Sequence, residues 1–358
     1  MMRVFIALLL SISVLPVHAC TGILLKSKDN ACIYARTLEF GIDLQSKVLF
    51  VPRNFAFAAA SPHSSIVGLQ WRSRHAVVGI NIFDSTNFVD GINEQGLAGG
   101  IFYFPGFAQY QSVTQQQYAQ SLPAWQLLTW VLTQCASVAE VKNTVPTLWV
   151  TDVPFTGAGP SLPQSMQHAP IHLIVHDAQG NSVVIEYVKG ILQLHDNPLG
   201  VITNAPDFQW HLTNLRNYIN LSPTNASTKT MAKMHFEPLG MGSGMHGLPG
   251  DFTPPSRFVR AVTYTQAAPV MSKAQEAVKQ AFHILHNFDI PQGVVRDANG
   301  AFDYTTWTSA CDMQNKIYYW RPYNNFQLKK VTLAHMNVTA KEVRTFPLEH
   351  VEEIIEIQ

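Results

Sequence analysis

Beyond residue 20 the chain alternates between short apolar runs and short polar stretches. Residues 21–26 and 31–36 are mostly apolar and of strand length, and the polar residues 28–30 lie between them. Two such runs joined by residues that favour a turn predict a β-hairpin. Because the far end of a hairpin returns to its start, we expect Arg36 to lie close to Cys20.

Two further hairpins are predicted by the same kind of pattern. Residues 89–104 read as paired strands with turn residues at 93–96, and residues 171–187 hold two β-branched runs around a polar turn. Two adjacent glycines, at positions 99 and 100, fall inside a predicted strand. Their missing side chains allow another backbone or a ligand to come close.

Helical periodicity appears in the middle and in the last third of the chain. Residues 122–135 predict a helix preceded by Ser121, with Pro123 in its first turn, where a missing N–H is harmless. A second helix is predicted from the capping box that runs from Ser137 to Glu140. The other predicted elements are a polar helix through residues 215–218, helices that begin at Ser256 and Ser272, and strands at residues 304–311, 316–321 and 328–334.

The order of these elements is strands, helices, strands, a helix and strands again. No internal repeat, low-complexity run or Pro/Gly/Ser linker marks a boundary after residue 20. Helices and sheets with one apolar face must cover one another. We therefore predict an α+β fold in one catalytic domain, residues 20–358, as a four-layer αββα sandwich whose sheets take strands from both ends of the chain.

The first nineteen residues have the features of a secretory signal peptide. Arg3 supplies a positive charge, and residues 4–15 form an apolar run that Pro16 ends. The run is shorter than the roughly 20 apolar residues that span a bilayer. We predict that residues 1–19 are removed after Ala19 and that the protein is exported, to the periplasm or the medium of a bacterium.

Removal of the leader makes Cys20 the first residue of the chain. Its free α-amine, with an ordinary pKa of about 7.7–8.0, can take the proton of a thiol whose pKa is about 8.5. Nucleophile and base then sit on one residue, as in an N-terminal nucleophile hydrolase. The alternative is a lipoprotein in which a lipidated Cys20 is only an anchor. His18, a large residue beside the cut, fits the small-residue pattern of that motif poorly.

The composition agrees with a single secreted globular unit, and the length suits one large domain or two small ones. Removing 19 of 358 residues leaves 339, and hydrophobic residues make up 47% of the chain, enough for a sizeable core. The 24 Lys and Arg balance 24 Asp and Glu without a basic block, so charge gives no case for nucleic acid or an anionic membrane as a partner. Cys32, Cys135 and Cys311 are expected to be buried thiols, with disulfides as the alternative. We expect a small, partly apolar substrate.

Pattern alone leaves two interpretations for several candidate residues. Tyr103 and Phe104 follow the paired glycines, and either line a pocket or belong to the core. Asn204 precedes a Pro-bounded turn, where its amide either donates to an oxyanion or bonds its own backbone. Arg36 and Glu39, taken alone, are more typical of a surface ion pair.

Three other features bear on the chemistry. His168, His172 and His176 are evenly spaced, but they fall on a predicted strand without a carboxylate or cysteine cluster, so we expect no metal site. Residues 240–251 are rich in glycine but lack the motif of a phosphate loop or a nucleophile elbow, and we interpret them as a mobile loop over a pocket. Arg257 is a cation in the first turn of a predicted helix, which indicates a partner there.

Taken together, these motifs resemble the choloylglycine hydrolase family, the bile salt hydrolases and penicillin V acylases among the N-terminal nucleophile hydrolases. The resemblance covers nearly all of the chain after Ala19. Several motifs in the family's order are more specific than any one of them alone. The matching motifs are Cys20-Thr21 and residues 36–40, 93–100, 203–206, 247–251, 256–258 and 307–312.

The resemblance implies the αββα fold and roles for five residues. Cys20 would be the nucleophile and, through its amine, the base, and Arg36 would support the thiolate. Asn204 would donate to the oxyanion, and Arg257 would complete the polar cluster. Glu39 stands where the family usually has Asp, the acid that holds the N-terminal amine.

The resemblance also implies a substrate class and an assembly. A small amphipathic N-acyl amide would be cleaved at a linear amide bond outside a peptide chain, without metal or organic cofactor. Its acyl side would sit among Phe102, Tyr103 and Phe104, and the tyrosine is the residue that penicillin V acylases carry there. Penicillin V, conjugated bile acids and N-acyl homoserine lactones remain open as substrates, and a lipid-anchored binding protein is the alternative of a different class. The family implies a homo-oligomer, commonly a homotetramer, and no stable membrane insertion.

Overall fold

Two β-sheets stack face to face in the computed structural model, which describes residues 19–63, 65–157, 167–298 and 300–357. The predicted leader, apart from Ala19, lies outside the described residues. The larger sheet has eight strands in the order β13-β12-β11-β8-β7-β6-β3-β20. Their bounds are β3 (Lys47–Val51), β6 (Val77–Asn81), β7 (Phe88–Asn93), β8 (Ala98–Tyr103), β11 (Ile171–His176), β12 (Ser182–Val188), β13 (Ile191–Asp196) and β20 (Arg344–Pro347).

The smaller sheet joins the first strands of the described chain to the last ones. Its order is β1-β2-β17-β18-β19, and a short strand, β16, pairs with β17. This confirms the prediction that a sheet is assembled from both ends of the sequence. The bounds are β1 (Cys20–Lys26), β2 (Cys32–Phe40), β16 (Val295–Arg296), β17 (Phe302–Asp312), β18 (Ile317–Pro322) and β19 (Lys329–Thr332).

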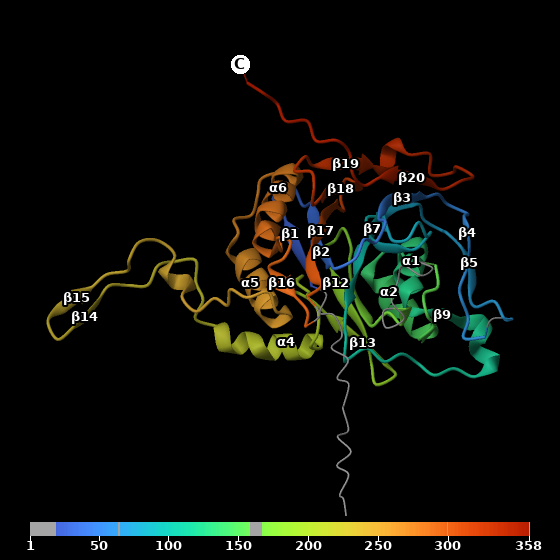
Figure 1. The fold of residues 1–358 in the computed structure, drawn as a ribbon, viewed down its shortest axis with the longest axis horizontal. Coiled ribbons are helices and arrows are strands. Elements are labelled where there is room, and N and C mark those ends of the chain that lie inside the picture. The colour runs from blue at the N-terminus through green and yellow to red at the C-terminus, as the bar shows by residue number, and fades with distance from the viewer. Residues whose placement is uncertain (1–18, 64, 158–166, 299, 358) are drawn as a thin grey trace, which may run out of the picture.

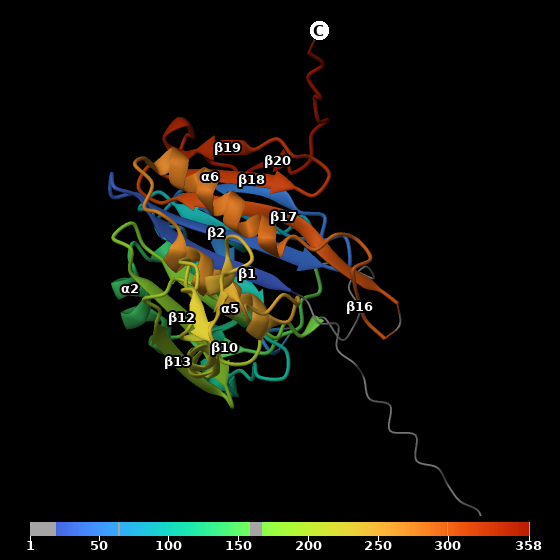
Figure 2. The ribbon, with the colours of Figure 1, turned by 90° about the vertical axis from the view of Figure 1, so that its left-hand side faces the viewer.

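Helices cover the outer faces of both sheets, which completes the predicted αββα sandwich (Figures 1 and 2). Helices α1 (Ala124–Gln134) and α2 (Val138–Thr144) pack on the larger sheet, and α5 (Pro254–Ala267) and α6 (Ala274–Leu285) pack on the smaller one. A further helix, α4 (Phe208–Leu215), packs against α5. The apolar core accordingly falls into one cluster between the sheets and beneath α5 and α6, and another beneath α1 and α2.

Two helix starts differ from the prediction. The residues expected in the first turn of α1 form a short strand, β9 (Ser121–Pro123), that pairs with β10 (Trp149–Thr151), so the helix begins at Ala124. The helix α6 begins two residues after Ser272. The predicted cap at Ser137 is confirmed, because its side chain accepts the Glu140 N–H. The hairpin turn at residues 93–96 is also present, with the Gly96 N–H donating to the Asn93 carbonyl at 3.0 Å.

A long arm projects from the sandwich between α4 and α5 (Figure 1). It carries the two-stranded hairpin β14 (Lys229–Met231) and β15 (Met234–Phe236), and a short 3-10 turn at Ser243–Met245. The glycine-rich segment lies in this arm and bonds to residues 222–226. The interpretation of that segment as a loop over the pocket is therefore corrected: none of its residues lines the cavity at Cys20.

All four cysteines are free and buried, as predicted over the disulfide alternative. Within the described residues, no helix has both the length and the apolar character that crossing a membrane would take. A small two-stranded sheet of β4 (Ala56–Ala58) and β5 (Gln70–Arg72) completes the architecture.

Candidate active site

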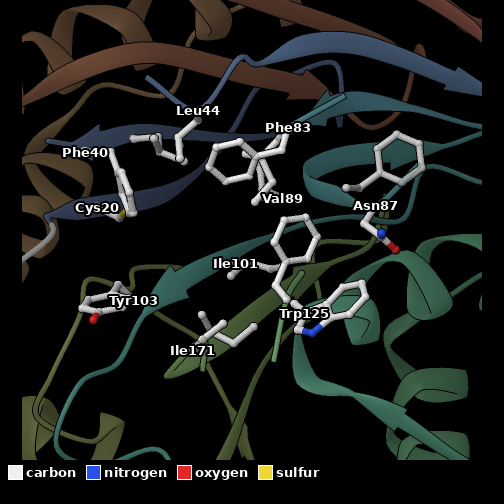
Figure 3. Close-up of a pocket in the computed structure, with 15 residues that line it drawn as sticks. Cys20, Phe40, Leu44, Phe83, Asn87, Val89, Ile101, Tyr103, Trp125 and Ile171 are labelled. Atoms are coloured by element: carbon white, nitrogen blue, oxygen red, sulfur yellow. The ribbon is translucent and has the colours of Figure 1, made fainter. Parts of the chain in front are cut away.

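Cys20 lies at the start of β1 and is buried, with 4% of its surface exposed. The register of the first hairpin pairs it with Leu38 and pairs Gly22 with Arg36, so the predicted return of the hairpin is confirmed. Cys20 and Phe40 face Ile101 and Tyr103 across a cavity between the two sheets (Figure 3). Ala19 is joined to Cys20 here, so the Cys20 nitrogen is an amide that stands in for the α-amine of a cleaved chain.

The Cys20 nitrogen donates to Asn204 Oδ1 at 2.8 Å. Asn204 reaches this position because the Ile202 backbone pairs with that of Gly22 beside β1. Its Nδ2 donates to the Tyr103 carbonyl at 2.8 Å. The oxygen of the Asn204 amide therefore accepts the hydrogen bond from the Cys20 nitrogen. One of the two Nδ2 hydrogens is used in the bond to the Tyr103 carbonyl. The role of oxyanion donor, for which the second hydrogen is available, stays a prediction.

Arg257 is fully buried and joins Asn204 to the first residues of β1. Its Nη2 donates to Asn204 Oδ1 at 2.6 Å, and its Nη1 donates to Thr21 Oγ1 at 2.9 Å and to the Cys20 carbonyl. Burial lowers the pKa of Arg257 to about 10, while the charge of Glu39 opposes that shift. The prediction that this first-turn arginine has a partner is confirmed. Ser256 is not the helix cap, however, because α5 begins two residues earlier, at Pro254.

Arg36 is fully buried behind Cys20. Its Nη1 donates to the carbonyls of Ile101 at 2.6 Å and Val89 at 3.2 Å, and its guanidinium lies 4.3 Å from the centre of the Phe102 ring. A Cβ at Gly99 would lie 2.5 Å from the Ile174 carbonyl oxygen of the neighbouring strand, so the close backbone approach predicted for the paired glycines is confirmed. Burial raises the pKa of the Cys20 thiol, and the charge of Arg36 is the largest influence that opposes this rise.

Glu39 is also fully buried, which excludes a surface ion pair with Arg36. Its Oε1 accepts a hydrogen bond from Thr305 Oγ1 at 3.0 Å. Burial raises the pKa of Glu39 to about 7, although the charge of Arg257 opposes the rise. Its negative charge also raises the pKa of Cys20. Glu39 thus acts on Cys20 through its charge, while the hydrogen bond from the Cys20 nitrogen goes to Asn204.

The cavity at Cys20 has a volume of about 120 Å³. Tyr103 lines it, as one interpretation of the sequence predicted, but Phe102 and Phe104 do not, which corrects their placement. Adjacent side chains of a strand point to opposite faces, so Ile101 and Tyr103 face the cavity while Phe102 packs under Arg36. Phe104 instead stacks on His172, with ring centres 4.3 Å apart.

Sequence reasoning missed most of the cavity wall. Aromatic and aliphatic residues from separate segments come together there, and their spacing in the sequence carries no shared signal. The strand alternation in β2 could have identified Phe40, which lies two residues after Leu38 on the same face. The missed lining residues are Leu38, Phe40, Leu44, Ile82, Phe83, Asn87, Phe88, Val89, Ile101, Trp125, Phe155, Ala169 and Ile171.

The evenly spaced histidines do not gather at one point. His172 and His176 are buried on β11, and His172 bonds to Glu186 and to a backbone carbonyl. His168 is exposed and contacts Asp152. In the part of the chain that the structure describes, no three His, Cys, Asp or Glu side chains are arranged to hold a metal ion.

Known proteins are similar to this chain in sequence and in fold. Residues 20–346 match the family of linear amide C-N hydrolases described as the choloylglycine hydrolase family. A bile salt hydrolase/transferase of Clostridium perfringens is 31% identical over 329 residues, which cover 91% of this chain and 96% of the relative. A penicillin V acylase of Pectobacterium atrosepticum is 24% identical, over 92% of this chain and 86% of that protein.

A solved structure of a mutant conjugated bile acid hydrolase from Clostridium perfringens superposes with a TM-score of 0.83 at 29% identity. The alignment covers 95% of this chain and 100% of the chain in the solved structure. The similarity thus extends over nearly the whole chain, both in sequence and in fold.

Proposed function

We propose that this chain, which belongs to the choloylglycine hydrolase family of linear amide C-N hydrolases, acts on N-acyl amides whose acyl group is an aryl or alkyl group without hydroxyls. The lining of the cavity at Cys20 carries this proposal. Among the described residues that line it, none is charged, and the polar side-chain groups are those of Cys20, Asn87, Tyr103 and Trp125. A ring or an alkyl chain loses no hydrogen bond there, whereas an acyl hydroxyl would have few partners.

The chemistry proceeds through Cys20. Its thiolate attacks the amide carbonyl, the C–N bond breaks, and the leaving nitrogen takes the proton that the α-amine removed from the thiol. Water then attacks the thioester of the acyl-enzyme, which releases the acid and regenerates the thiol. In this proposal Arg36 favours the thiolate, while Arg257 and Asn204 hold the amine in place. Asn204 also contributes its second N–H to the oxyanion.

Conjugated bile acids are the second candidate substrate, favoured by the relative that is 31% identical and is named as a bile salt hydrolase/transferase. Their steroid acyl groups are larger and carry hydroxyls. Such a group would enter the cavity only with those hydroxyls turned toward its mouth. N-acyl homoserine lactones present an alkyl acyl chain and fall within the class that we propose.

A panel of glycine amides with one leaving group tests the acyl preference. N-phenoxyacetylglycine and N-decanoylglycine are expected to have kcat/KM values at least about 10-fold above that of cholylglycine, because unpaired hydroxyls cost about 1–3 kcal/mol each. The measurement is the rate of glycine release. Phe155→Ala removes an aromatic side chain from the cavity wall and is expected to reduce the ratio of these kcat/KM values. Phe326→Ala removes an exposed ring outside the lining and is expected to leave the ratio unchanged. A wild-type preference for cholylglycine would contradict the proposal.

Arg36 and Asn204 are expected to give different signatures when each is replaced by alanine. Arg36→Ala removes the charge that opposes the burial of Cys20, so the thiol pKa read from alkylation rate against pH should rise. Asn204→Ala should leave that titration nearly unchanged and lower kcat by roughly 10²–10³, the usual cost of one oxyanion donor, with little change in substrate affinity. If Asn204→Ala moves the titration and Arg36→Ala only lowers kcat, the two roles are reversed.

We also propose that the leader is removed after Ala19 and that the protein works outside the cytoplasm, in the periplasm or the medium. Two observations support this. The leader has the charge and apolar run of a signal peptide. The Cys20 nitrogen is already placed against Asn204 Oδ1, where a freed amine would be held beside its own thiol.

We propose in addition that copies of this chain associate through the projecting arm, as a homo-oligomer and, following the family, a homotetramer. The arm projects away from the sandwich (Figure 1). Several of its large apolar side chains are exposed. Apolar patches of this kind on a water-exposed hairpin are typical of contact surfaces. The exposed residues are Met231, Met234, Phe236, Leu239 and Met241.

Replacing the apolar side chains of the arm is expected to reduce the assembly to monomers. A triple variant, Met231→Ser, Met234→Ser and Phe236→Ser, removes apolar contact area without touching the core. Light scattering coupled to size exclusion measures the mass. Lys229→Ser with Lys233→Ser, exposed polar positions on the same hairpin, is the matched control and should keep the wild-type mass. An unchanged mass in the triple variant would rule out the arm as the contact.

A further inference from the structure

A buried histidine and a buried glutamate lie behind the segment that carries Asn204. His172, on β11, contacts Glu186 Oε1 of β12 through Nδ1 at 2.9 Å. Its Nε2 lies 3.0 Å from the Thr203 carbonyl oxygen. Both side chains are within the core, and neither lines the cavity at Cys20. The roles assigned so far leave this pair unexplained.

The contacts of this pair fix the orientation of the His172 ring. A carbonyl oxygen only accepts, so His172 Nε2 carries a hydrogen toward Thr203. Glu186 also accepts the Phe208 N–H, at 3.1 and 3.3 Å. Burial alone would raise the pKa of Glu186, but the interaction with His172 outweighs it and brings the value to about 2, with a smaller contribution from His195. The ionised carboxylate therefore lies against the other edge of the ring, at Nδ1.

The peptide that bears Asn204 is held from both sides. His172 holds the Thr203 carbonyl, and His211 Nε2 lies 2.9 Å from the Asn204 carbonyl oxygen. Phe104 stacks on the His172 ring with an interplanar angle of 1°, which keeps that ring in its plane. Asn204 has to place one oxygen against both the Cys20 nitrogen and Arg257, at 2.8 and 2.6 Å. A small tilt of the peptide would break one of these contacts.

We propose that Glu186 and His172 are positioning residues for Asn204: the pair anchors the Thr203 carbonyl and thereby aims the Asn204 side chain at the nitrogen of Cys20. Neither residue touches the substrate or the reacting atoms. Both residues affect the reaction only through the position of the Asn204 side chain. Catalytic groups are sensitive to this kind of support, since a misplacement of about 1 Å can cost on the order of 100-fold in rate.

A double-mutant cycle with Asn204 tests the proposal. In the wild-type background, His172→Leu and the isosteric Glu186→Gln are each expected to lower kcat by about 10- to 100-fold, because the residue that they support loses its position. The KM should stay within about two-fold of the wild-type value. In the Asn204→Ala background, the same substitutions should lower kcat by less than about two-fold further, because the side chain that they aim is gone. The assay uses whichever amide of the glycine panel the wild-type chain hydrolyses fastest, so the result does not depend on the acyl preference.

The control is His176→Leu, the same substitution four residues along β11. His176 is equally buried, and neither of its ring nitrogens has a hydrogen-bond partner among the described residues. This variant should keep the wild-type kcat. Thermal melting of all variants identifies any that do not fold, and Glu186→Gln, which keeps the size of the side chain, carries the test if His172→Leu fails to fold. An unchanged kcat in the single variants, or losses that add fully to that of Asn204→Ala, would overturn the proposal.

Discussion

Replacing Cys20 by alanine is expected to lower kcat for amide hydrolysis by a factor on the order of 10⁴ or more, because it removes the thiol that forms the acyl-enzyme. Cys20→Ser should also lose activity by orders of magnitude. An alkoxide is much harder to form near neutral pH than a thiolate, and burial, which already raises the pKa of the Cys20 thiol, disfavours either anion. The measurement is amine release with each variant under saturating substrate.

The matched control is another buried thiol. Cys135 lies in the core beneath α1 and α2 and does not line the cavity. Cys135→Ala is expected to retain the wild-type kcat, with at most a small loss of stability from the deleted sulfur. Hydrolysis at the wild-type rate by Cys20→Ala would show that another residue performs the chemistry.

Retention of residues 1–19 is expected to abolish turnover as completely as the loss of the thiol. A peptide nitrogen shares its lone pair with the carbonyl and cannot act as a base, so an uncleaved Cys20 has a thiol without a partner to take its proton. In the uncleaved form the Ala19 carbonyl also accepts the Glu39 N–H at 2.9 Å, next to the nucleophile. The lack of a base and the Ala19 carbonyl beside the nucleophile both oppose attack of the thiol on a substrate.

Two preparations of the protein test this expectation. One is the whole chain expressed without export, so that residues 1–19 are retained. The other begins at Cys20, released from a fusion partner that leaves no extra residue. Intact mass verifies each N-terminus and shows whether Cys20 carries a lipid. Turnover by the uncleaved form at the rate of the cleaved form would exclude the amine as the base.

Local patterns in the sequence were sufficient for the architecture. Alternating and β-branched runs located β1, β2, β7, β8 and the hairpin of residues 171–187, because side chains of a strand alternate between buried and exposed faces. In the larger sheet, strands β3, β13 and β20 were not predicted. Their apolar residues lie in short runs next to polar or proline-rich stretches, and pairing within the sheet defines them more than their own composition does.

The position of the nucleophile was also readable from the sequence. A small residue before Cys20 indicated the cut, and a hairpin after it indicated that Arg36 returns to the thiol. The resemblance assigned roles to Asn204 and Arg257, which lie far along the chain but meet Cys20 in the structure. That meeting depends on α5 and on the segment at Ile202 packing beside β1, which no local pattern expresses.

The sequence by itself therefore determined the order of the elements, the layers they form and the residue that carries the nucleophile, since each follows from the periodicity or chemistry of a short stretch. Only the tertiary structure decided which aromatic rings line the cavity and which support it, that Glu39 is fully buried, and that Asn204 turns its oxygen toward Cys20. These outcomes depend on side chains from several elements competing for the same space and the same hydrogen bonds. That competition is resolved only when distant segments pack together.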